Sequence, residues 1–545
     1  MTNVTSLEKA AEKLAKGGKG SRRPKAEKSS GTYDANGKRV IRHLAGELPS
    51  ILDQLGAALA EANANLFRYA GRLARVYQAG EEQHGDVKRA AGALLVHPVE
   101  AAHLQELGGR AADHEKWDSR STAFVPCDMP RRVADVYLAR GHWPELPALN
   151  GFVEAPTITP DWRLIDQPGY DIPTGLFSAY ATIPGYRRPP EKPTRDDALR
   201  ALETLSALFE SFPFVDDSDR SAMLAGVLTS VLRRMLPAAP MFAITAPTPG
   251  TGKTLLCETL AILATDRRAS VLSLGHDDAE TEKRLTGVLL AGDAVISVDN
   301  IERPLKGDLL CQVTTQQFVR LRPLGGSGML SIPTHALLVA TGNNLSIVGD
   351  LKRRVVLVRL DAGIERPEQR TFDTDHLATV SARRGEIITS ALTLALSYGK
   401  AGAPKIAGLH ALGGFEIWDR MVRRPLVWLD LPDPLEASEG LRDQDPDIEA
   451  MRLLFSSWLA VFGNAPTTVS DVVAAGNETS PMTQTYMNTE LRDALQLVCA
   501  EKLNSRRLGY WLRAHRERIV DGLQLRQSGA DGHAKVAKWR VIKCG

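Results

Sequence analysis

The sequence predicts an α/β protein built on a parallel sheet, and three apolar stretches that each end in polar residues carry this prediction. The first, 241–246 (MFAITA), runs into a glycine-rich turn and then a helical pattern, LLCETLAIL. The second, 294–298 (AVISV), ends in Asp299, and the third, HALLVATGNN, ends in Asn343 and Asn344. Open parallel sheets gather their functional groups at the carboxyl ends of such strands.

Residues 247–254 (PTPGTGKT) have the order of parts of a phosphate-binding P-loop. Glycines let backbone N–H groups close around phosphates, and the helix N-terminus adds a favourable dipole. Lys253 would reach the β- and γ-phosphates of ATP, and the Thr254 hydroxyl would bind Mg²⁺. Pro247 replaces the first glycine of the usual pattern, and a chance glycine-rich turn beside a surface lysine is the alternative. The predicted nucleotide-binding residues are Pro249, Gly250, Thr251, Gly252, Lys253 and Thr254.

The second feature of the predicted site is acidic: about 45 residues after Lys253, the strand 294–298 ends in Asp299. A carboxylate at the end of a strand beside the P-loop strand would complete the Mg²⁺ shell, so the predicted metal residues are Thr254 and Asp299. In the usual pattern a second acidic residue follows and orients the attacking water, but Asn300 occupies that position here. Either Glu302 substitutes for it, or hydrolysis is slow.

Two further polar groups complete the predicted catalytic set. Asn343 would lie between the other two strands and orient the attacking water, unless 342–344 is only a turn. Arg353 and Arg354 precede another apolar strand, where an arginine would reach the γ-phosphate bound by a neighbouring subunit. A solvated strand end is the alternative for both arginines.

Composition indicates an ordinary soluble protein, with 43% hydrophobic and 24% charged residues in 545. We find no apolar run near the roughly 20 residues that cross a bilayer and no secretory signal, which predicts a cytoplasmic protein without a membrane partner. Five scattered cysteines predict neither a disulfide framework nor a zinc site. The net charge of +2 is uneven: residues 1–42 and 504–543 each carry +7, and the remainder carries −12. Basic ends on an acidic body suggest a polyanion partner, although a basic tail is often only a solvated arm.

Composition shifts divide the chain into several parts. Helical patterns at 46–62 and 129–141 alternate with two-stranded patterns at 66–78 and 157–171. A proline-rich linker and a later acidic, proline-rich loop, 430–447, flank the ATPase region. The predicted domains are a disordered basic arm at 1–35, an α+β domain at 36–185, an ATPase with flanking helices at 195–431, and a winged helix at 449–545.

The last segment predicts a winged helix because a capped basic helix precedes a two-stranded wing. Asn504 or Ser505 would cap that helix, and Leu508, Trp511 and Leu512 would pack inward. Its basic side chains suit neutralisation of DNA phosphates, whereas a winged helix used only for protein contacts is the alternative. The predicted DNA-binding residues of this segment are Arg506, Arg507, Arg513, Lys535 and Lys538.

The series APTPGTGKT, VISVDN, LLVATGN and LKRRVVLVRL resembles the motifs of superfamily 3 helicases within the AAA+ class. More closely, the chain resembles primase-helicase-type replication proteins of bacterial prophages and integrative mobile elements. DQPGYDIPTGLF, KRLTGVLLAGDAVISVDN and NSRRLGYWLRAHRERIVDGLQL carry that similarity, which extends over about 40–542. The resemblance makes Asn343 the sensor, Arg354 the arginine finger, and a hexameric ring around DNA the expected assembly.

In such proteins a hairpin before the sensor strand projects into the channel of the ring, and 318–333 has that form here. Arg320 and Arg322 have the same strand parity, so both would face DNA, unless they form structural ion pairs. The implied function is an ATP-dependent DNA helicase with possible replication partner proteins. An ATP-switched assembly factor that does not unwind DNA is the alternative. A primase function is not expected, because residues 40–185 contain no paired acidic motif on a strand, which a primase active site needs.

Overall fold

The structure is a computed structural model, and its described part of the chain forms two compact units. One consists of Met1–Glu302, Gly307–Leu345 and Val358–Pro432, and the other of Arg303–Lys306, Ser346–Leu357 and Asp433–Gly545. The predicted disordered arm lies almost wholly outside the described residues. These are 32–34, 37–62, 65–78, 83–84, 87–88, 94–180, 182–275, 278–301, 303–322, 329–370, 374–443, 446–481, 483–499, 503–530 and 536–544.

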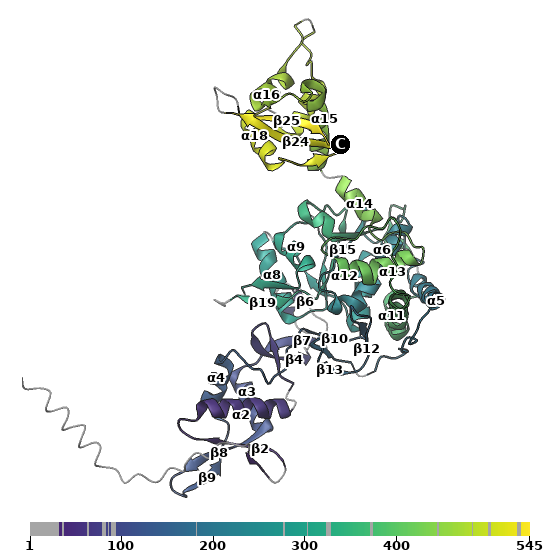
Figure 1. Cartoon of the computed structure of the whole chain (residues 1–545). Helices are drawn as coiled ribbons and strands as arrows, with labels where there is room; N and C mark the ends of the chain where they lie inside the picture. The colour runs from purple at the N-terminus through teal and green to yellow at the C-terminus, as the bar shows by residue number, and fades with distance from the viewer. Residues whose placement is uncertain are drawn as a thin grey trace, which may run out of the picture. The chain divides into compact units, whose positions relative to one another are not determined.

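The largest sheet has seven strands, and its four neighbours β15, β20, β17 and β16 run parallel, which confirms the predicted mixed α/β class. Figure 1 labels two strands of this sheet, β15 and β6. β15, β17 and β20 are almost completely buried, as expected where both faces of a parallel sheet are covered. β20, the strand of Asn343, lies between β15 and β17 as predicted, so the expectation that the strand ending in Asp299 lies beside β15 was wrong. In sheet order, the strands are β21 (Val355–Arg359), β15 (Met241–Ala246), β20 (Leu337–Asn343), β17 (Val295–Val298), β16 (Ser270–Leu272), β6 (Val87–Lys88) and β5 (Gln83–His84).

The helices that accompany this sheet begin with clear sequence signals. α5 and α6 each start with a capping box, formed by Thr194 with Asp197 and by Asp216 with Asp219. α6 is buried along nearly its whole length because α7 and α11 pack against it. These helices are α5 (Arg195–Ala207), α6 (Asp217–Leu232), α7 (Lys253–Thr265), α8 (Asp278–Ala291), α9 (Asp308–Thr315), α10 (His376–Ala382), α11 (Arg384–Lys400), α12 (Glu416–Trp418) and α13 (Arg424–Trp428).

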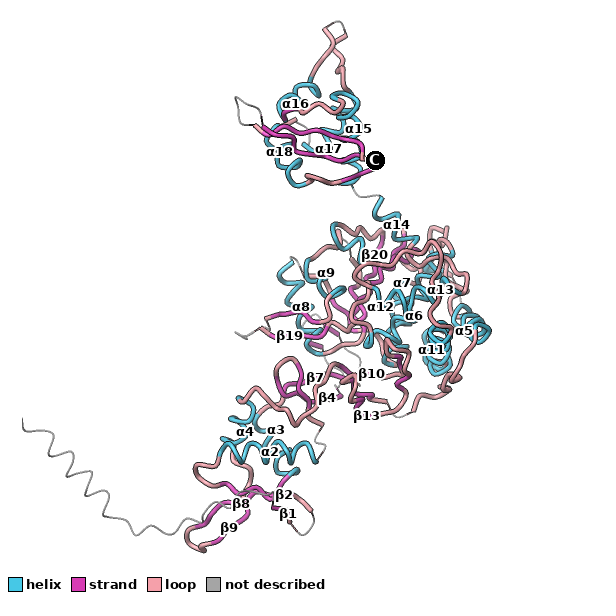
Figure 2. Tube along the Cα trace, in the orientation of Figure 1, coloured by secondary structure: helices cyan, strands magenta, loops and turns pink. Residues whose placement is uncertain are grey.

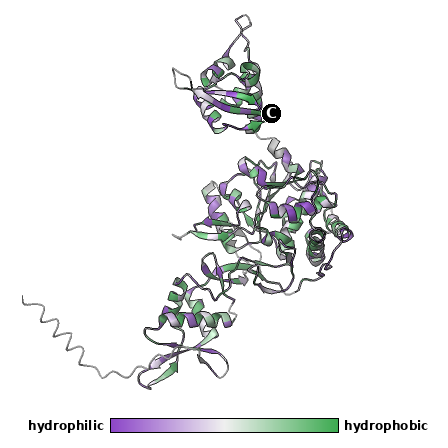
Figure 3. Ribbon diagram, in the orientation of Figure 1, coloured by the Kyte–Doolittle hydropathy of each residue, from purple (hydrophilic) through white to green (hydrophobic). Residues whose placement is uncertain are grey.

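The chain before α5 mixes small sheets and helices. α2 (Leu48–Glu61), α3 (Ala101–Ala111) and α4 (Arg131–Ala139) share a core with the sheet β1-β2-β8-β9, and Figure 3 shows both green and purple along the amphipathic α2. The strands of that sheet are β1 (Thr32–Tyr33), β2 (Arg39–His43), β8 (Ala112–Asp118) and β9 (Ala123–Pro126). A second sheet contains β3 (Phe67–Tyr69), β4 (Arg72–Gln78) and β7 (Leu94–Pro98).

The remaining short strands of this part are β10 (Gly151–Val153), β11 (Thr157–Ile158), β12 (Leu164–Ile165), β13 (Gly169–Asp171) and β14 (Leu176–Ser178). The predicted helices at 46–62 and 129–141 and the predicted two-stranded pattern at 66–78 are confirmed as α2, α4 and the β3–β4 hairpin. The pairing of β6 with β16, which adds β6 and its partner β5 to the large sheet, was not predicted.

The C-terminal segment has its own core around a four-stranded antiparallel sheet, β22-β25-β24-β23, with helices beside it (Figure 2). Asn504 caps α18, and Leu508 and Leu512 are fully buried, as predicted. The elements are α14 (Glu436–Asp443), α15 (Pro446–Phe462), β22 (Thr467–Thr468), α16 (Val469–Asn477), α17 (Thr489–Cys499), α18 (Ser505–Ala514), β23 (Ile519–Val520), β24 (Leu523–Ala530) and β25 (Ala537–Lys543). Among the described helices, none has the length and apolarity needed to cross a membrane.

Candidate functional site

The predicted P-loop connects the end of β15 directly to the start of α7. Gly252 is the N-cap of α7 and has a φ of +101°, a backbone conformation that a residue with a Cβ adopts only with strain. A Cβ at Gly252 would also lie 2.9 Å from the Phe212 ring. Lys253 and Thr254 therefore begin the helix, where N–H groups without partners in the helix favour an anion.

The Lys253 ammonium donates hydrogen bonds to two neutral oxygens, 3.0 Å to the Thr248 carbonyl and 3.2 Å to the Thr251 hydroxyl. Burial lowers the pKa of Lys253, and the carboxylate of Asp299 acts in the opposite direction. A partly desolvated ammonium that donates to neutral groups gains from a bound anion, so the residues present fit a phosphate.

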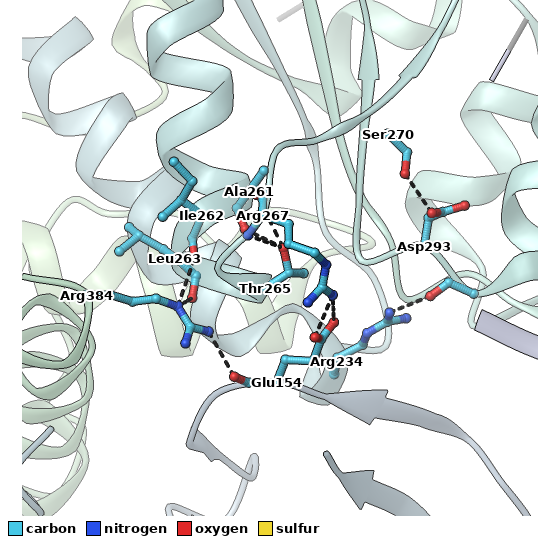
Figure 4. A network of polar contacts seen from close by, with 11 residues as sticks. Glu154, Arg234, Ala261, Ile262, Leu263, Thr265, Arg267, Ser270, Asp293 and Arg384 are labelled. Atoms are coloured by element: carbon cyan, nitrogen blue, oxygen red, sulfur yellow. Dashed lines mark hydrogen bonds and ion pairs between the residues drawn. The ribbon is translucent and has the colours of Figure 1, made fainter. Parts of the chain in front are cut away.

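A network of polar contacts holds the far end of α7 (Figure 4). Arg384 donates from Nε to the Ile262 carbonyl at 2.8 Å, and its other nitrogen binds the Glu154 carbonyl, also at 2.8 Å. The Glu154 carboxylate pairs with Arg267, which follows α7 in the chain. A cation at a helix C-terminus satisfies the last carbonyls and complements the helix dipole. The helix that carries Lys253 is thus anchored at the end opposite the predicted P-loop.

Asp299 follows the last residue of β17, and its side chain is tied to the next strand. One carboxylate oxygen accepts hydrogen bonds from the Thr341 hydroxyl on β20 and from the Asn300 N–H, the latter at 2.9 Å. Asn300 has a φ of +52°, which asparagine tolerates better than most residues, and its side chain is exposed. Glu302, the predicted substitute acid, lies outside the described residues.

Asn343 ends β20 as predicted, opposite Ala246 of β15 in the sheet register. The neighbouring N–H groups fix this end of the strand: Asn344 donates to the Ala246 carbonyl at 3.0 Å, and Leu345 donates to the Thr245 hydroxyl at 2.9 Å. Gly342 is required by packing, because a Cβ there would lie 2.7 Å from the Ile301 carbonyl oxygen. The sheet thus brings Lys253, Asp299 and Asn343 to the carboxyl ends of three adjacent parallel strands.

The role of the Thr341 hydroxyl was not predicted. The T-x-N pattern at the end of β20 identifies the position of Thr341 in the sequence. It does not predict the hydrogen bond from the Thr341 hydroxyl to Asp299. The Arg384 and Glu154 contacts with α7 had no signal, because these residues lie more than 90 positions from that helix.

The two arginines before β21 share one carboxylate, that of Asp350. Arg354 donates from Nε to Asp350 at 3.0 Å, and its side chain is 18% exposed. The Arg353 side chain is 65% exposed. Both belong to the short helical turn Gly349–Arg354 that leads into the strand.

The predicted hairpin is formed by β18 (Phe318–Leu321) and β19 (Leu330–Pro333), which pair antiparallel. Its tip, 323–328, lies outside the described residues. Arg320 is exposed on the face opposite the buried Val319 and Leu321, and Arg322 is exposed just after the strand. The predicted shared orientation of the two arginines agrees with this alternation.

In the C-terminal segment, Arg506, Arg507 and Arg513 are exposed on α18, whose opposite face contributes to the core. Lys538 is half-buried on β25, and Lys535 lies outside the described residues. One helix thus carries three exposed cations on one side of an independently packed core.

No family model matches the sequence, and no curated protein matches it. Solved structures that resemble the chain include the NrS-1 C-terminal region, at 10% identity and a TM-score of 0.37, covering 80% of this chain and 98% of that one. A structure described as SCCmec type IV Cch, active helicase, is 12% identical with a TM-score of 0.30, covering 88% of this chain and 97% of that one. The JCV helicase is 11% identical with a TM-score of 0.21, covering 46% and 73%. These low scores leave the function to be argued from the site itself.

Proposed function

We propose that this protein is an ATP-dependent DNA helicase or replication protein of a mobile genetic element, which hydrolyses ATP at subunit interfaces of an oligomeric ring. The observation that carries the proposal is the convergence of Lys253, Asp299 and Asn343 at the carboxyl ends of β15, β17 and β20. An ammonium, a carboxylate and an amide at one sheet edge suit phosphate binding, metal binding and positioning of a water molecule.

In this proposal each group of the chain has one task. The N–H groups at the start of α7 and the Lys253 ammonium hold the phosphates, and the Thr254 hydroxyl and Asp299 carboxylate hold Mg²⁺. Bound Mg²⁺ would supply charge neutralisation on the transferred phosphoryl group. Asn343 orients the attacking water, and Arg354 acts on the site of the neighbouring subunit after exchanging Asp350 for the phosphate. Thr341 keeps the Asp299 carboxylate turned toward the site.

The DNA contacts in this proposal come from two places. Arg320 and Arg322 on the β18–β19 hairpin would follow the strand in the channel, and hydrolysis would move the hairpins. The 449–545 segment would act as a winged helix whose basic helix, α18, neutralises phosphates. A cytoplasmic location and a hexameric ring belong to the same proposal.

One observation favours a second function, an ATP-switched DNA-binding assembly factor without unwinding. Asn300 stands where a second acid would activate water, and its exposed amide cannot accept a proton as a carboxylate does. Slow hydrolysis would suit a protein that assembles with ATP and disassembles slowly.

Strand displacement on a forked DNA duplex with ATP and Mg²⁺ separates the two functions. The native chain is compared with Lys253→Ala and Arg354→Ala, and Arg353→Ala serves as the matched control because it shares the Asp350 partner. The helicase proposal predicts unwinding by the native chain and the control only, with ATP binding retained in Arg354→Ala. Binding of DNA and ATP without any unwinding by the native chain would favour the assembly factor.

A further inference from the structure

A cluster of cationic and aromatic side chains lies on the β3-β4-β7 sheet, in the part of the chain to which the proposed function gives no role. β4 and β7 are neighbouring strands (Figure 1) and pair antiparallel. Arg75 lies opposite His97, and Tyr77 follows two residues later on the same face of β4. The Arg75 guanidinium lies 5.9 Å from the centre of the Tyr77 ring. The Tyr77 and His97 rings meet edge to face, with centroids 5.4 Å apart at 88°. We call Arg75, Tyr77, His97 and the nearby His103 the β4–β7 face.

The local charge of this face is positive. Segment 66–78 contains Arg68, Arg72 and Arg75 and no acidic residue. The register places Arg68, opposite Leu73, on the same face as Arg75, whereas Arg72, opposite Tyr69, lies on the other face. His103, near the start of α3, has a lowered pKa, chiefly through burial and then through the charge of Arg75. The Glu106 carboxylate lies 3.6 Å from His103 and also pairs with Arg110.

Arg75 has no carboxylate partner among the residues that the structure describes, and its Nε atom is buried without a hydrogen-bond acceptor. On the opposite face of the sheet, Phe67, Ala74 and Val96 belong to a hydrophobic core, which holds β4 and β7 in place. The β4–β7 face is therefore a preformed surface with an unneutralised guanidinium held beside two rings. His97 is exposed, and Arg75 and Tyr77 are half-buried.

We propose that the β4–β7 face binds single-stranded DNA. Bases splayed from a single strand stack on aromatic rings, and the same surface needs a cation for the phosphates between them. A strand-mounted pair of rings with an adjacent arginine supplies both, and the arginine also stacks on planar groups. A duplex keeps its bases inside and would leave the Tyr77 and His97 rings without a partner. This gives the N-terminal region a DNA contact separate in sequence from the β18–β19 hairpin and from α18.

The first test is photochemical cross-linking of the full-length chain to an oligothymidylate that carries 5-iodouracil, without ATP, followed by mass spectrometry of the peptides. The proposal predicts an adduct on Tyr77 or His97. It is overturned if adducts form on the hairpin or the C-terminal segment while peptides containing 66–78 and 94–103 stay unmodified. Because ATP is absent, the result is independent of whether the protein unwinds DNA, and Lys253→Ala should give the same adduct.

The second test compares Arg75→Gln and Tyr77→Leu in the full-length chain by fluorescence anisotropy with the same oligothymidylate over a range of salt concentrations. Arg75→Gln should lower the slope of log K against log salt by about 0.7, the value for one phosphate contact with a single strand. Tyr77→Leu should weaken binding roughly 5- to 150-fold with an unchanged slope, because it removes stacking and no charge.

Arg131→Gln is the matched control, since it removes one cation from α4 in the same region, where the side chain is 72% exposed. The proposal fails if Arg75→Gln and Arg131→Gln have equal slopes, or if Tyr77→Leu binds like the native chain. Thermal melting of each variant shows whether it has folded, and the cross-linking result stands independently of the variants.

Discussion

Replacing Thr341 with valine tests the contact that links the two strands of the site. The Thr341 hydroxyl and the Asn300 N–H donate to the same oxygen of Asp299. Thr341 is 2% exposed in the middle of a buried strand, and valine has nearly the same shape and the same preference for strands. The substitution therefore removes one hydrogen bond to the carboxylate and leaves the strand in place.

The magnitude follows from the charge of the acceptor. A hydrogen bond to a charged group contributes about 1.5–3 kcal/mol, which corresponds to roughly a 10- to 150-fold fall in kcat/KM for ATP if the carboxylate loses its orientation. Because Asp299 is assigned to the metal, the Mg²⁺ concentration for half-maximal activity should rise as well. Binding of nucleotide without Mg²⁺ should change little, since Lys253 is untouched.

Steady-state ATPase rates with single-stranded DNA, measured over a Mg²⁺ titration, give both quantities. Thr341→Ser is the control, because it keeps the hydroxyl and should retain most of the activity. The reasoning is refuted if Thr341→Val stays within twofold of the native rate, or if the serine variant loses as much activity as the valine variant.

Three further predictions concern stability and turnover. Arg233→Met should lower the free energy of unfolding by about 3 kcal/mol in chemical denaturation, because three buried carbonyls, including that of Ala336, lose their donor; a loss below 1 kcal/mol would contradict this. Burial, with the charges of Arg233 and Arg234, lowers the pKa of His335 to about 3, so only the unfolded chain binds this proton between about pH 6.5 and 3. The free energy of unfolding should therefore decrease as the pH is lowered through that window, and it should decrease less steeply in His335→Leu. Equal pH slopes in the native chain and the variant would argue against the assignment. Asn300→Asp should raise the ATPase rate if a missing base limits hydrolysis, and an unchanged rate would locate the limit elsewhere.

The parallel sheet and the ends of its strands were predictable because each carries a local signal. An apolar run that ends in Asp299 or in Asn343 needs no knowledge of distant residues, and Asn504 marks its helix start by the cap alone. The strand order was not predictable in full, since periodicity says nothing about neighbours. The expectation that β17 lies beside β15 was wrong for this reason.

Long-range contacts were beyond the sequence for a physical reason. The pairing of β6 with β16 joins residues more than 180 positions apart, and strands of two residues carry no periodic pattern. In the sequence, Arg384 and Glu154 look like ordinary charged residues of a helix and a loop. Only the fold brings them to the C-terminal end of α7. The choice of Arg354 over Arg353 rests on the resemblance, because both arginines contact Asp350.

The most direct test of a shared active site is to mix two inactive variants. Lys253→Ala removes the phosphate ligand of a subunit's own site, and Arg354→Ala removes the group given to its neighbour. In a ring with head-to-tail interfaces, an equal mixture makes about one interface in four intact, with Lys253 from one variant and Arg354 from the other. The account predicts that this mixture regains roughly a quarter of the native DNA-stimulated ATPase rate at matched protein concentration, whereas each variant alone has none. If the mixture stays as inactive as its components, or if Arg354→Ala alone keeps the native rate, the site is not shared between subunits.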